Sequence, residues 1–129
     1  MREVERKFLL LNEIEQVIEK MNNDLECIVV EGLKDRIALR ELGFEKDIIE
    51  CSNLGFGIID ELENKKVAIL TDYDKHGTMM WKKLSRALES RGAKVDDTYR
   101  KKIGELLNVE KRKTIEAINN LKKEVDTLW

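Results

Sequence analysis

The sequence contains no proline, a single histidine and only two cysteines. Two cysteines are too few for a disulfide framework or a cysteine-rich metal cluster. Cys27 and Cys51 each lie in an apolar, strand-like run, which predicts buried free thiols. If those strands are parallel neighbours, one thiol lies near the start of its strand and the other near the end of its own, beyond the reach of a disulfide.

Long apolar runs are also missing. The run over 8–11 is far too short to cross a membrane and is followed by acids, and no segment resembles a signal peptide. We therefore expect a cytoplasmic protein with no membrane partner. A length of 129 residues, with 39% charged and 42% hydrophobic residues, indicates one domain over 1–129 with surface ion pairs.

Charge of one sign is not in excess overall, because the net charge is −2, and this predicts no general attraction to nucleic acid. The distribution is uneven, however. Residues 1–31 carry a net charge of −4, whereas residues 100–123 carry eight basic side chains against three acids. Such a basic segment fits either a solvated helix face or a surface that contacts phosphates.

Strand-like and helix-like patterns alternate along the chain. Apolar residues at helical spacing predict an N-terminal helix over 2–22, and a capping box of Asn12 and Glu15 would divide it into two. The remaining predictions are strands over 27–30, 47–51, 66–71 and 93–97, the last at an edge; helices over 34–42, 56–63, 78–90 and 109–125; and a basic loop over 98–104. This order predicts an α/β fold: a four-stranded, mostly parallel sheet with helices on both faces, plus N-terminal and C-terminal helices.

The C-terminal helix over 109–125 is expected to turn apolar side chains inward and its basic side chains outward. The inward residues are Ile115, Ile118, Leu121 and Val125, and the outward ones are Lys111, Arg112, Lys113, Lys122 and Lys123. The two tryptophans, Trp81 and Trp129, are expected to pack in the core and at the terminus, respectively.

Two of the predicted strands end in acids and a glycine. The strand over 27–30 is followed by Glu31 and Gly32, and the strand over 66–71 by Asp72, Asp74 and Gly77. The carboxyl ends of parallel strands lie at one edge of a sheet, so three carboxylates converge there if the strands are neighbours. Their mutual repulsion would require a bound cation or a raised pKa. The two aspartates alone also fit a polar turn in which one of them caps the next helix.

These residues resemble a known family. The run from Ile28 to Asp35 (Ile-Val-Val-Glu-Gly-x-x-Asp) and the run from Val67 to Gly77, with Thr-Asp-x-Asp-x-x-Gly at its end, resemble the two motifs of the Toprim domain. Bacterial-type primases, type IA and type II topoisomerases, overcoming-lysogenization-defect nucleases, RecR repair proteins and a ribonuclease that matures ribosomal RNA share that domain. The resemblance covers about 26–100, and the chain is similar to small stand-alone Toprim proteins.

The resemblance implies a Mg²⁺-dependent module, with Mn²⁺ as an alternative ion, that processes phosphodiester bonds in DNA or RNA. It makes Glu31 the general acid/base or a metal ligand, and Asp72 and Asp74 the carboxylates that hold the ion. Gly32 would let the backbone approach phosphate, and Gly77 would serve the turn into the next helix. Asp35 matches the last residue of the first motif, where capping the helix is as good an interpretation as catalysis.

Basic residues near these motifs are second-tier candidates. Lys34, Lys75 and His76 are placed to bind substrate phosphate, although a lone loop histidine is more often a bystander. Arg100, Lys101 and Lys102 are candidate nucleic-acid contacts. Tyr73 lies between the two aspartates, and we expect its ring to point away from the metal and to pack.

Other functions stay open at this point. The same fold serves as a non-catalytic module that binds nucleic acid or a protein partner in a larger complex, and the basic segment favours that interpretation. A phosphatase of the haloacid-dehalogenase type also places Asp-x-Asp after a strand, but it leaves Glu31 and Gly32 unexplained. The sequence does not distinguish DNA from RNA, cleavage from synthesis, or a monomer from a dimer.

Overall fold

A parallel sheet of four strands lies at the centre of the computed structural model, which describes residues 1–128. The strands are β1 (Cys27–Val30), β2 (Asp47–Glu50), β3 (Lys66–Leu70) and β4 (Lys94–Asp96). Their order is β2-β1-β3-β4, and every neighbouring pair is parallel. The predicted α/β class is confirmed, with β4 at an edge as expected.

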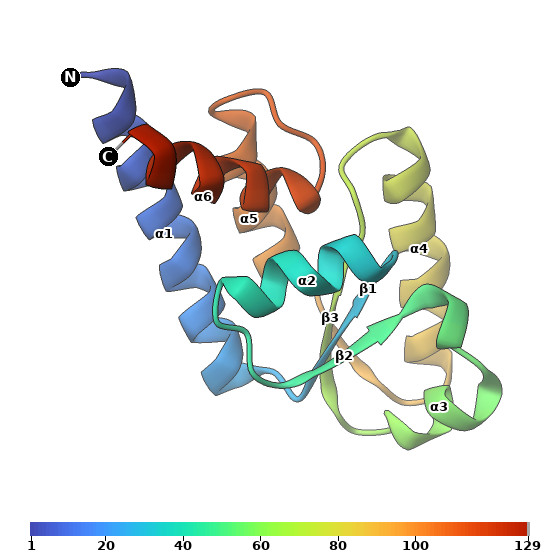
Figure 1. Cartoon of the computed structure of the whole chain (residues 1–129). Coiled ribbons are helices and arrows are strands. Elements are labelled where there is room, and N and C mark those ends of the chain that lie inside the picture. The colour runs from blue at the N-terminus through green and yellow to red at the C-terminus, as the bar shows by residue number, and fades with distance from the viewer. Residues whose placement is uncertain (129) are drawn as a thin grey trace.

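Helices cover both faces of the sheet (Figure 1). On one face pack α1 (Glu3–Asp24), α2 (Leu33–Glu41), α5 (Thr98–Asn108) and α6 (Glu116–Leu128). On the other face pack α3 (Phe56–Glu61) and α4 (Lys75–Ser90), and a single 3-10 turn, Cys51–Asn53, follows β2.

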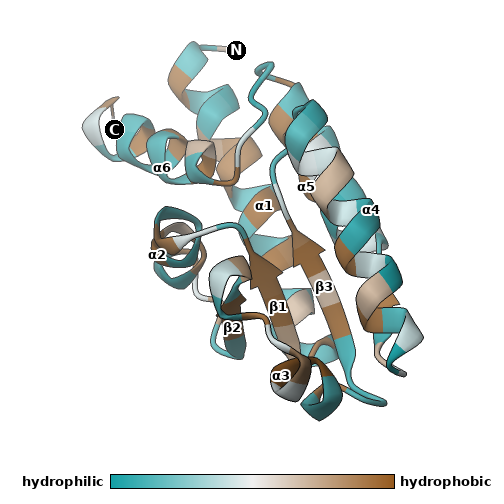
Figure 2. Cartoon of the chain, turned by 90° about the vertical axis from the view of Figure 1, so that its right-hand side faces the viewer, coloured by the Kyte–Doolittle hydropathy of each residue, from teal (hydrophilic) through white to brown (hydrophobic). Residues whose placement is uncertain are grey.

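The two central strands are apolar throughout because both of their faces are covered. Every residue of β1 is buried, as are the last four of β3, and both strands are brown in the hydropathy view of Figure 2. Side chains alternate between the two cores, as strand geometry requires. The larger core receives Ile28, Val30, Ala68 and Leu70, and the smaller one receives Cys27, Val29, Val67 and Ile69.

The N-terminal segment forms one helix and not two. Asn12 and Glu15 lie exposed on the outer side of α1, so the capping box that would have divided the helix is not used. The opposite side carries the predicted apolar stripe of Leu11, Ile14, Val17, Ile18 and Met21, which is buried against the larger core together with Leu10. Phe8, expected to extend the stripe, is exposed.

The C-terminal predictions were wrong in where the helices begin and end. The expected basic loop over 98–104 is the first part of α5, and the helix expected over 109–125 begins only at Glu116. The chain leaves α5 through Lys111, whose φ of 56° is left-handed and ends a helix. The Thr114 hydroxyl then accepts the Ala117 N–H at 3.1 Å and starts α6. The four apolar residues expected to face inward are nevertheless buried.

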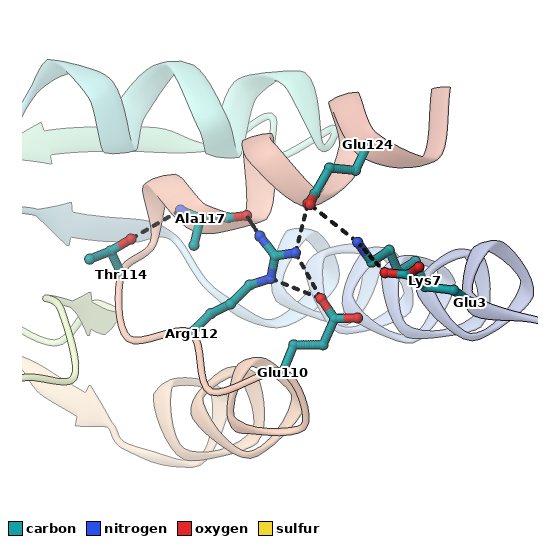
Figure 3. A network of polar contacts seen from close by, with 7 residues as sticks. All are labelled: Glu3, Lys7, Glu110, Arg112, Thr114, Ala117 and Glu124. Atoms are coloured by element: carbon teal, nitrogen blue, oxygen red, sulfur yellow. Dashed lines mark hydrogen bonds and ion pairs between the residues drawn. The ribbon is translucent and has the colours of Figure 1, made fainter. Parts of the chain in front are cut away.

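Arg112 does not point outward as expected. Its guanidinium donates to the carboxylates of Glu110 and Glu124 at 2.7 and 2.6 Å, and Glu124 also pairs with Lys7 of α1 (Figure 3). Lys7 in turn pairs with Glu3. This network joins α1, the connection between α5 and α6, and α6 itself, so part of the basic segment is structural.

The cysteines and Trp81 lie in or beside the cores of the protein. Cys27 is buried, Cys51 is half-buried, and both thiols are free. Trp81 packs half-buried against the smaller core, whereas Trp129 lies outside the described residues. Within residues 1–128, no helix has the length and apolar character needed to span a membrane.

Candidate functional site

The ends of β1 and β3 lie side by side, as the sequence predicted. Val30 is paired with Leu70 in the sheet, so the chain segments that begin with Glu31 and Thr71 leave the same edge together. The Glu31 carboxylate accepts a hydrogen bond from the backbone N–H of Asp72 at 2.7 Å. The two residues, 41 positions apart in the sequence, therefore form the centre of the site.

Asp72 is also tied to the C-terminal part of the chain. Its Oδ1 accepts the backbone N–H of Ile115 at 2.9 Å, immediately before α6 begins. The neighbouring Tyr73 N–H donates to the carbonyl of Lys113 at 2.7 Å. The connection between α5 and α6 is thus attached to the end of β3 by two hydrogen bonds.

Three helices direct their N-termini toward these carboxylates. α2 begins directly after Gly32, α4 directly after Asp74, and α6 directly after Ile115. The first N–H groups of a helix and its dipole favour negative charge, whether on a side chain or on a bound phosphate. The amides at these N-termini donate to the acids of this edge, namely Asp35, Asp74 and Asp72, and so stabilise their negative charge.

The carboxylates at the centre are electrostatically strained. The pKa of Asp72 is raised to about 6, mainly by burial and in addition by the nearby charges of Glu31 and Asp35, while the hydrogen bond from Ile115 opposes the shift. Burial likewise raises the pKa of Asp35, which is only 8% exposed. Among residues 1–128, no lysine or arginine forms an ion pair with Glu31, Asp35 or Asp72. A cation or a proton would relieve this repulsion.

Asp74 does not join the other two predicted ligands as closely. β3 ends at Leu70, so the side-chain alternation of a strand does not extend to Asp72 and Asp74. Asp74 is the N-cap of α4, where its Oδ1 accepts the Gly77 N–H at 2.7 Å. In the part of the chain described, no three His, Cys, Asp or Glu residues form a group that could hold a metal ion.

The two glycines of the motifs lie in different environments. Gly32 has extended backbone angles, and a Cβ added there would meet nothing within 4 Å, so the space beside it is open to a ligand. Gly77 is buried in the first turn of α4, where a Cβ would overlap the carbonyl of Asp72. Its absent side chain therefore serves close packing, and the Thr71 hydroxyl donates to its carbonyl at 2.6 Å.

The basic candidates divide into exposed and engaged side chains. Lys75 and His76 are exposed at the start of α4, which begins three residues earlier than predicted. Lys34 is 80% exposed and lies 4.0 Å from Glu116. On α5, Lys102 is exposed and Lys101 pairs with Asp97 at 2.9 Å.

Arg100 is half-buried and engaged with the backbone that carries Asp72. Its guanidinium donates to the carbonyls of Thr71 and Asp72 and lies 4.5 Å from the centre of the Tyr73 ring. The Tyr73 hydroxyl donates to the carbonyl of Arg100 at 2.6 Å. Tyr73 therefore packs away from the acids, as expected, and Arg100 supports the turn that presents Asp72.

Two contributors to the site were missed or undervalued in the sequence. For Asp35, capping the helix and catalysis were equally good interpretations; the structure shows the cap, because its carboxylate accepts the Gly32 N–H at 3.1 Å, and it also adds a charge beside Glu31. Its position in the first motif could have indicated this. The Ile115 amide had no local signal, because the helix that it precedes was predicted to begin earlier.

Cys51 follows β2 at the same edge of the sheet. Burial raises the pKa of its thiol to about 11, and the charges of Glu31 and Asp35 act in the same direction. At neutral pH the side chain is therefore a protonated thiol, which makes it a poor nucleophile and metal ligand.

Comparisons with known proteins place the chain among similar archaeal sequences. A UPF0292 protein of Pyrococcus abyssi is 37% identical over 109 residues, which are 83% of this chain and 82% of that protein. A UPF0292 protein of Thermococcus sibiricus is 34% identical over 84% of both chains. A solved structure, described as a putative protein from Aquifex aeolicus, has a TM-score of 0.66 and 30% identity and covers 82% of this chain and 95% of its own. No family model matches the chain.

Proposed function

The chain belongs to the UPF0292 family, and we propose that it is a Toprim-like module that uses Mg²⁺ to make or break phosphodiester bonds in nucleic acid. One observation carries this proposal. Glu31 lies against the backbone of Asp72 at the carboxyl edge of a parallel sheet, with no basic side chain paired to either carboxylate within residues 1–128. Open α/β sheets bind their ligands at this edge.

The donors at this edge suit a hard divalent cation. Mg²⁺ prefers carboxylate oxygens, keeps several of its waters and is usually held by one or two carboxylates plus substrate phosphate. Asp72, with Asp74 nearby at the start of α4, meets that requirement without a closed protein cage, and Glu31 lies beside Asp72 as a further carboxylate. The raised pKa of Asp72, to about 6, measures the desolvation and repulsion that a cation would relieve. Bound there, Mg²⁺ or Mn²⁺ would neutralise charge that develops on the phosphate.

The protein's own groups then have separate roles. Glu31 is the carboxyl that would transfer a proton to or from the reacting oxygen, because it lies at the centre of the edge and next to Asp72. The open space beside Gly32 and the N-terminus of α2 would receive a phosphate. Lys34, Lys75 and His76 are exposed in the first turns of α2 and α4, where they would contact its oxygens.

The test is metal-dependent turnover of labelled single-stranded, duplex and structured RNA and DNA, with nucleoside triphosphates added in parallel to detect synthesis. We expect Glu31→Gln and Asp72→Asn each to lower the rate by at least about 100-fold. Glu89→Gln and Asp126→Asn are the matched controls, because both side chains are exposed and away from this edge. A wild-type protein that neither binds Mg²⁺ nor Mn²⁺ by calorimetry nor changes any of these substrates would refute the proposal.

A second candidate is a module that binds nucleic acid or a protein without catalysis. The observation in its favour is that the acids within residues 1–128 form no group of three able to hold a metal by itself, while α5 presents exposed lysines. This function predicts salt-sensitive binding that Asp72→Asn leaves unchanged. Binding of that kind without any metal-dependent reaction would select it over the enzyme.

A further inference from the structure

A groove with a basic lining runs along α5 beside the acidic centre. One wall is a stripe of α5 (Arg100, Lys101, Gly104, Glu105 and Asn108), and the other is formed by Tyr73, Arg112 and Lys113. Four of these side chains are basic and one is acidic. The groove therefore attracts anions, although the protein as a whole has a net charge of −2.

The available positive charge in this groove lies on two lysines and one arginine. Arg112 pairs with Glu110 and Glu124, so it lines the groove but has no unpaired charge to offer a phosphate. Lys113 is exposed, and Lys101 is 70% exposed in a solvent-facing ion pair with Asp97 that contributes little binding energy. Arg100 donates only to backbone carbonyls, so its charge has no carboxylate partner.

The dimensions and chemistry of the groove favour a polymer backbone. The stripe on α5 extends from Arg100 to Asn108, which at 1.5 Å per residue is about 12 Å. This length exceeds one phosphate and corresponds to roughly three nucleotides of a strand at 3.4 Å each. The aromatic ring of Tyr73 is packed under the Arg100 guanidinium and so close to Gly104 that a Cβ there would come within 2.6 Å of it. It offers no free surface for a base to stack on, so recognition rests on charge.

The groove borders the turn that carries Asp72. Lys113 is attached to that turn, since its carbonyl accepts the Tyr73 N–H at 2.7 Å. At the other wall, Arg100 contacts the carbonyl of Asp72. A strand lying along α5 would therefore pass next to the turn that presents Asp72, at the Arg100 end of the groove.

We propose that this groove binds the sugar–phosphate backbone of one nucleic-acid strand, independently of its sequence, and directs the strand to the acidic centre. Lys101 and Lys113 are the residues that contact its phosphates. The inference rests on the proposed function, because it assigns the path by which the substrate of that site approaches. It adds a binding surface built by α5 and by the connection to α6, which the motifs of the acidic edge do not include.

The experiment measures binding of a short fluorescent single-stranded RNA or DNA by anisotropy in EDTA, over a range of salt concentrations. We expect Lys101→Gln combined with Lys113→Gln to lower the salt slope by about 1.4, which corresponds to a loss of affinity of roughly 25-fold at 0.1 M salt. The arginine pair, Lys101→Arg with Lys113→Arg, keeps both charges and should retain binding. The control is Lys82→Gln with Lys83→Gln, two exposed lysines on α4.

The outcomes separate this inference from the proposed function. Wild-type affinity in the glutamine pair, or an equal loss in the α4 control, would overturn the groove as the binding surface. Equal competition by polyglutamate at the same charge concentration would also overturn it, because the groove would then be a general anion surface. If the strand does not bind although Mg²⁺ binds at Glu31 and Asp72 by calorimetry, the groove fails and the metal centre stands. If the lysines control binding but no reaction depends on metal, the groove stands and the enzyme fails.

Discussion

Replacing Asp72 by asparagine should stabilise the metal-free protein at neutral pH. The substitution removes the charge that burial and the neighbouring acids disfavour, while the amide oxygen still accepts the Ile115 N–H. The hydrogen bond to Glu31 comes from the backbone of residue 72, so it is retained as well. A residue proposed to act in function is therefore expected to lower stability in the absence of its ligand.

The size of this gain in stability follows from the pKa shift of Asp72. Asp72 has a pKa of about 6 in the folded protein, against 3.8 for an unperturbed aspartate. At 1.36 kcal/mol per unit this difference is about 3 kcal/mol, and solvent screening of a half-buried group reduces it to about 1.5 kcal/mol. For a chain of this size the gain corresponds to an increase in Tm of roughly 6 °C.

The dependence on pH provides a sharper test than one melting temperature. Because the folded protein holds the Asp72 proton more tightly than the unfolded chain does, wild type loses stability as the pH rises from about 4 to about 6. Asp72→Asn has no carboxyl that titrates at this position, so it does not lose stability in this way. The Tm values of the variant and of wild type should therefore agree near pH 4 and differ by the full amount, roughly 6 °C, near pH 7. Thermal unfolding followed by circular dichroism in EDTA measures this, with Asp126→Asn as the control for an exposed aspartate.

Two results would refute the reasoning. One is a variant that is no more stable than wild type at neutral pH, because burial and repulsion would then not strain Asp72. The other is a stability gain that is the same at both pH values. Adding Mg²⁺ should raise the Tm of wild type only, since saturation at 100 times Kd adds about 2.7 kcal/mol to a protein that binds the ion.

Three further predictions concern the support of the site, and urea denaturation measures each of them. Gly77→Ala should destabilise the protein by about 2 to 4 kcal/mol, because the new Cβ overlaps the carbonyl of Asp72, whereas Gly57→Ala, with open space around it, should be neutral or stabilising by about 0.5 kcal/mol. Thr71→Val keeps the shape of a buried side chain but removes its hydrogen bond to Gly77, which should cost about 1 kcal/mol, and no loss would show that this bond contributes nothing. Arg112→Met removes the arginine that pairs with Glu110 and Glu124 (Figure 3), which should lower the free energy of unfolding by about 1 to 3 kcal/mol, and by less at high salt. An unchanged urea midpoint would mean that the network does not stabilise the packing of α6.

Much of the site could be predicted from local sequence. The runs over 27–30 and 66–71 are almost continuously apolar, as expected for strands that are covered on both faces. An acid follows each run directly. Glu31 then lies next to the residues after β3 once these two strands are neighbours, and the structure shows that they are. The role of Asp74 as a helix cap was one of the two interpretations open from the sequence, and the structure shows that cap.

The C-terminal part was less predictable because two helices with similar patterns follow each other. The run over 98–104 is basic and polar, which resembles a loop, yet its apolar Ile103 is buried with Leu106 and Leu107 against the larger core. Arg100, Lys101 and Lys102 have high helix propensity, and packing against α1 and β3 stabilises the helix that they join. The break before α6 depends on the left-handed Lys111, a residue whose type does not announce such a turn.

Periodicity and residues adjacent in the chain were enough to predict the two central strands, the acids at their ends and most of the succession of strands and helices. Which acids interact, and what surrounds them, depends on how distant parts of the chain pack together. The raised pKa of Asp72 arises from burial beneath α6 and from Glu31 and Asp35, groups about 40 positions away. The basic groove forms only where α5, Tyr73 and Lys113 lie side by side in the folded chain. The ion-pair network of Arg112 likewise forms only where Glu124 of α6 lies next to Lys7 of α1. Desolvation and charge interactions depend on distance in space, which no local pattern in the chain encodes.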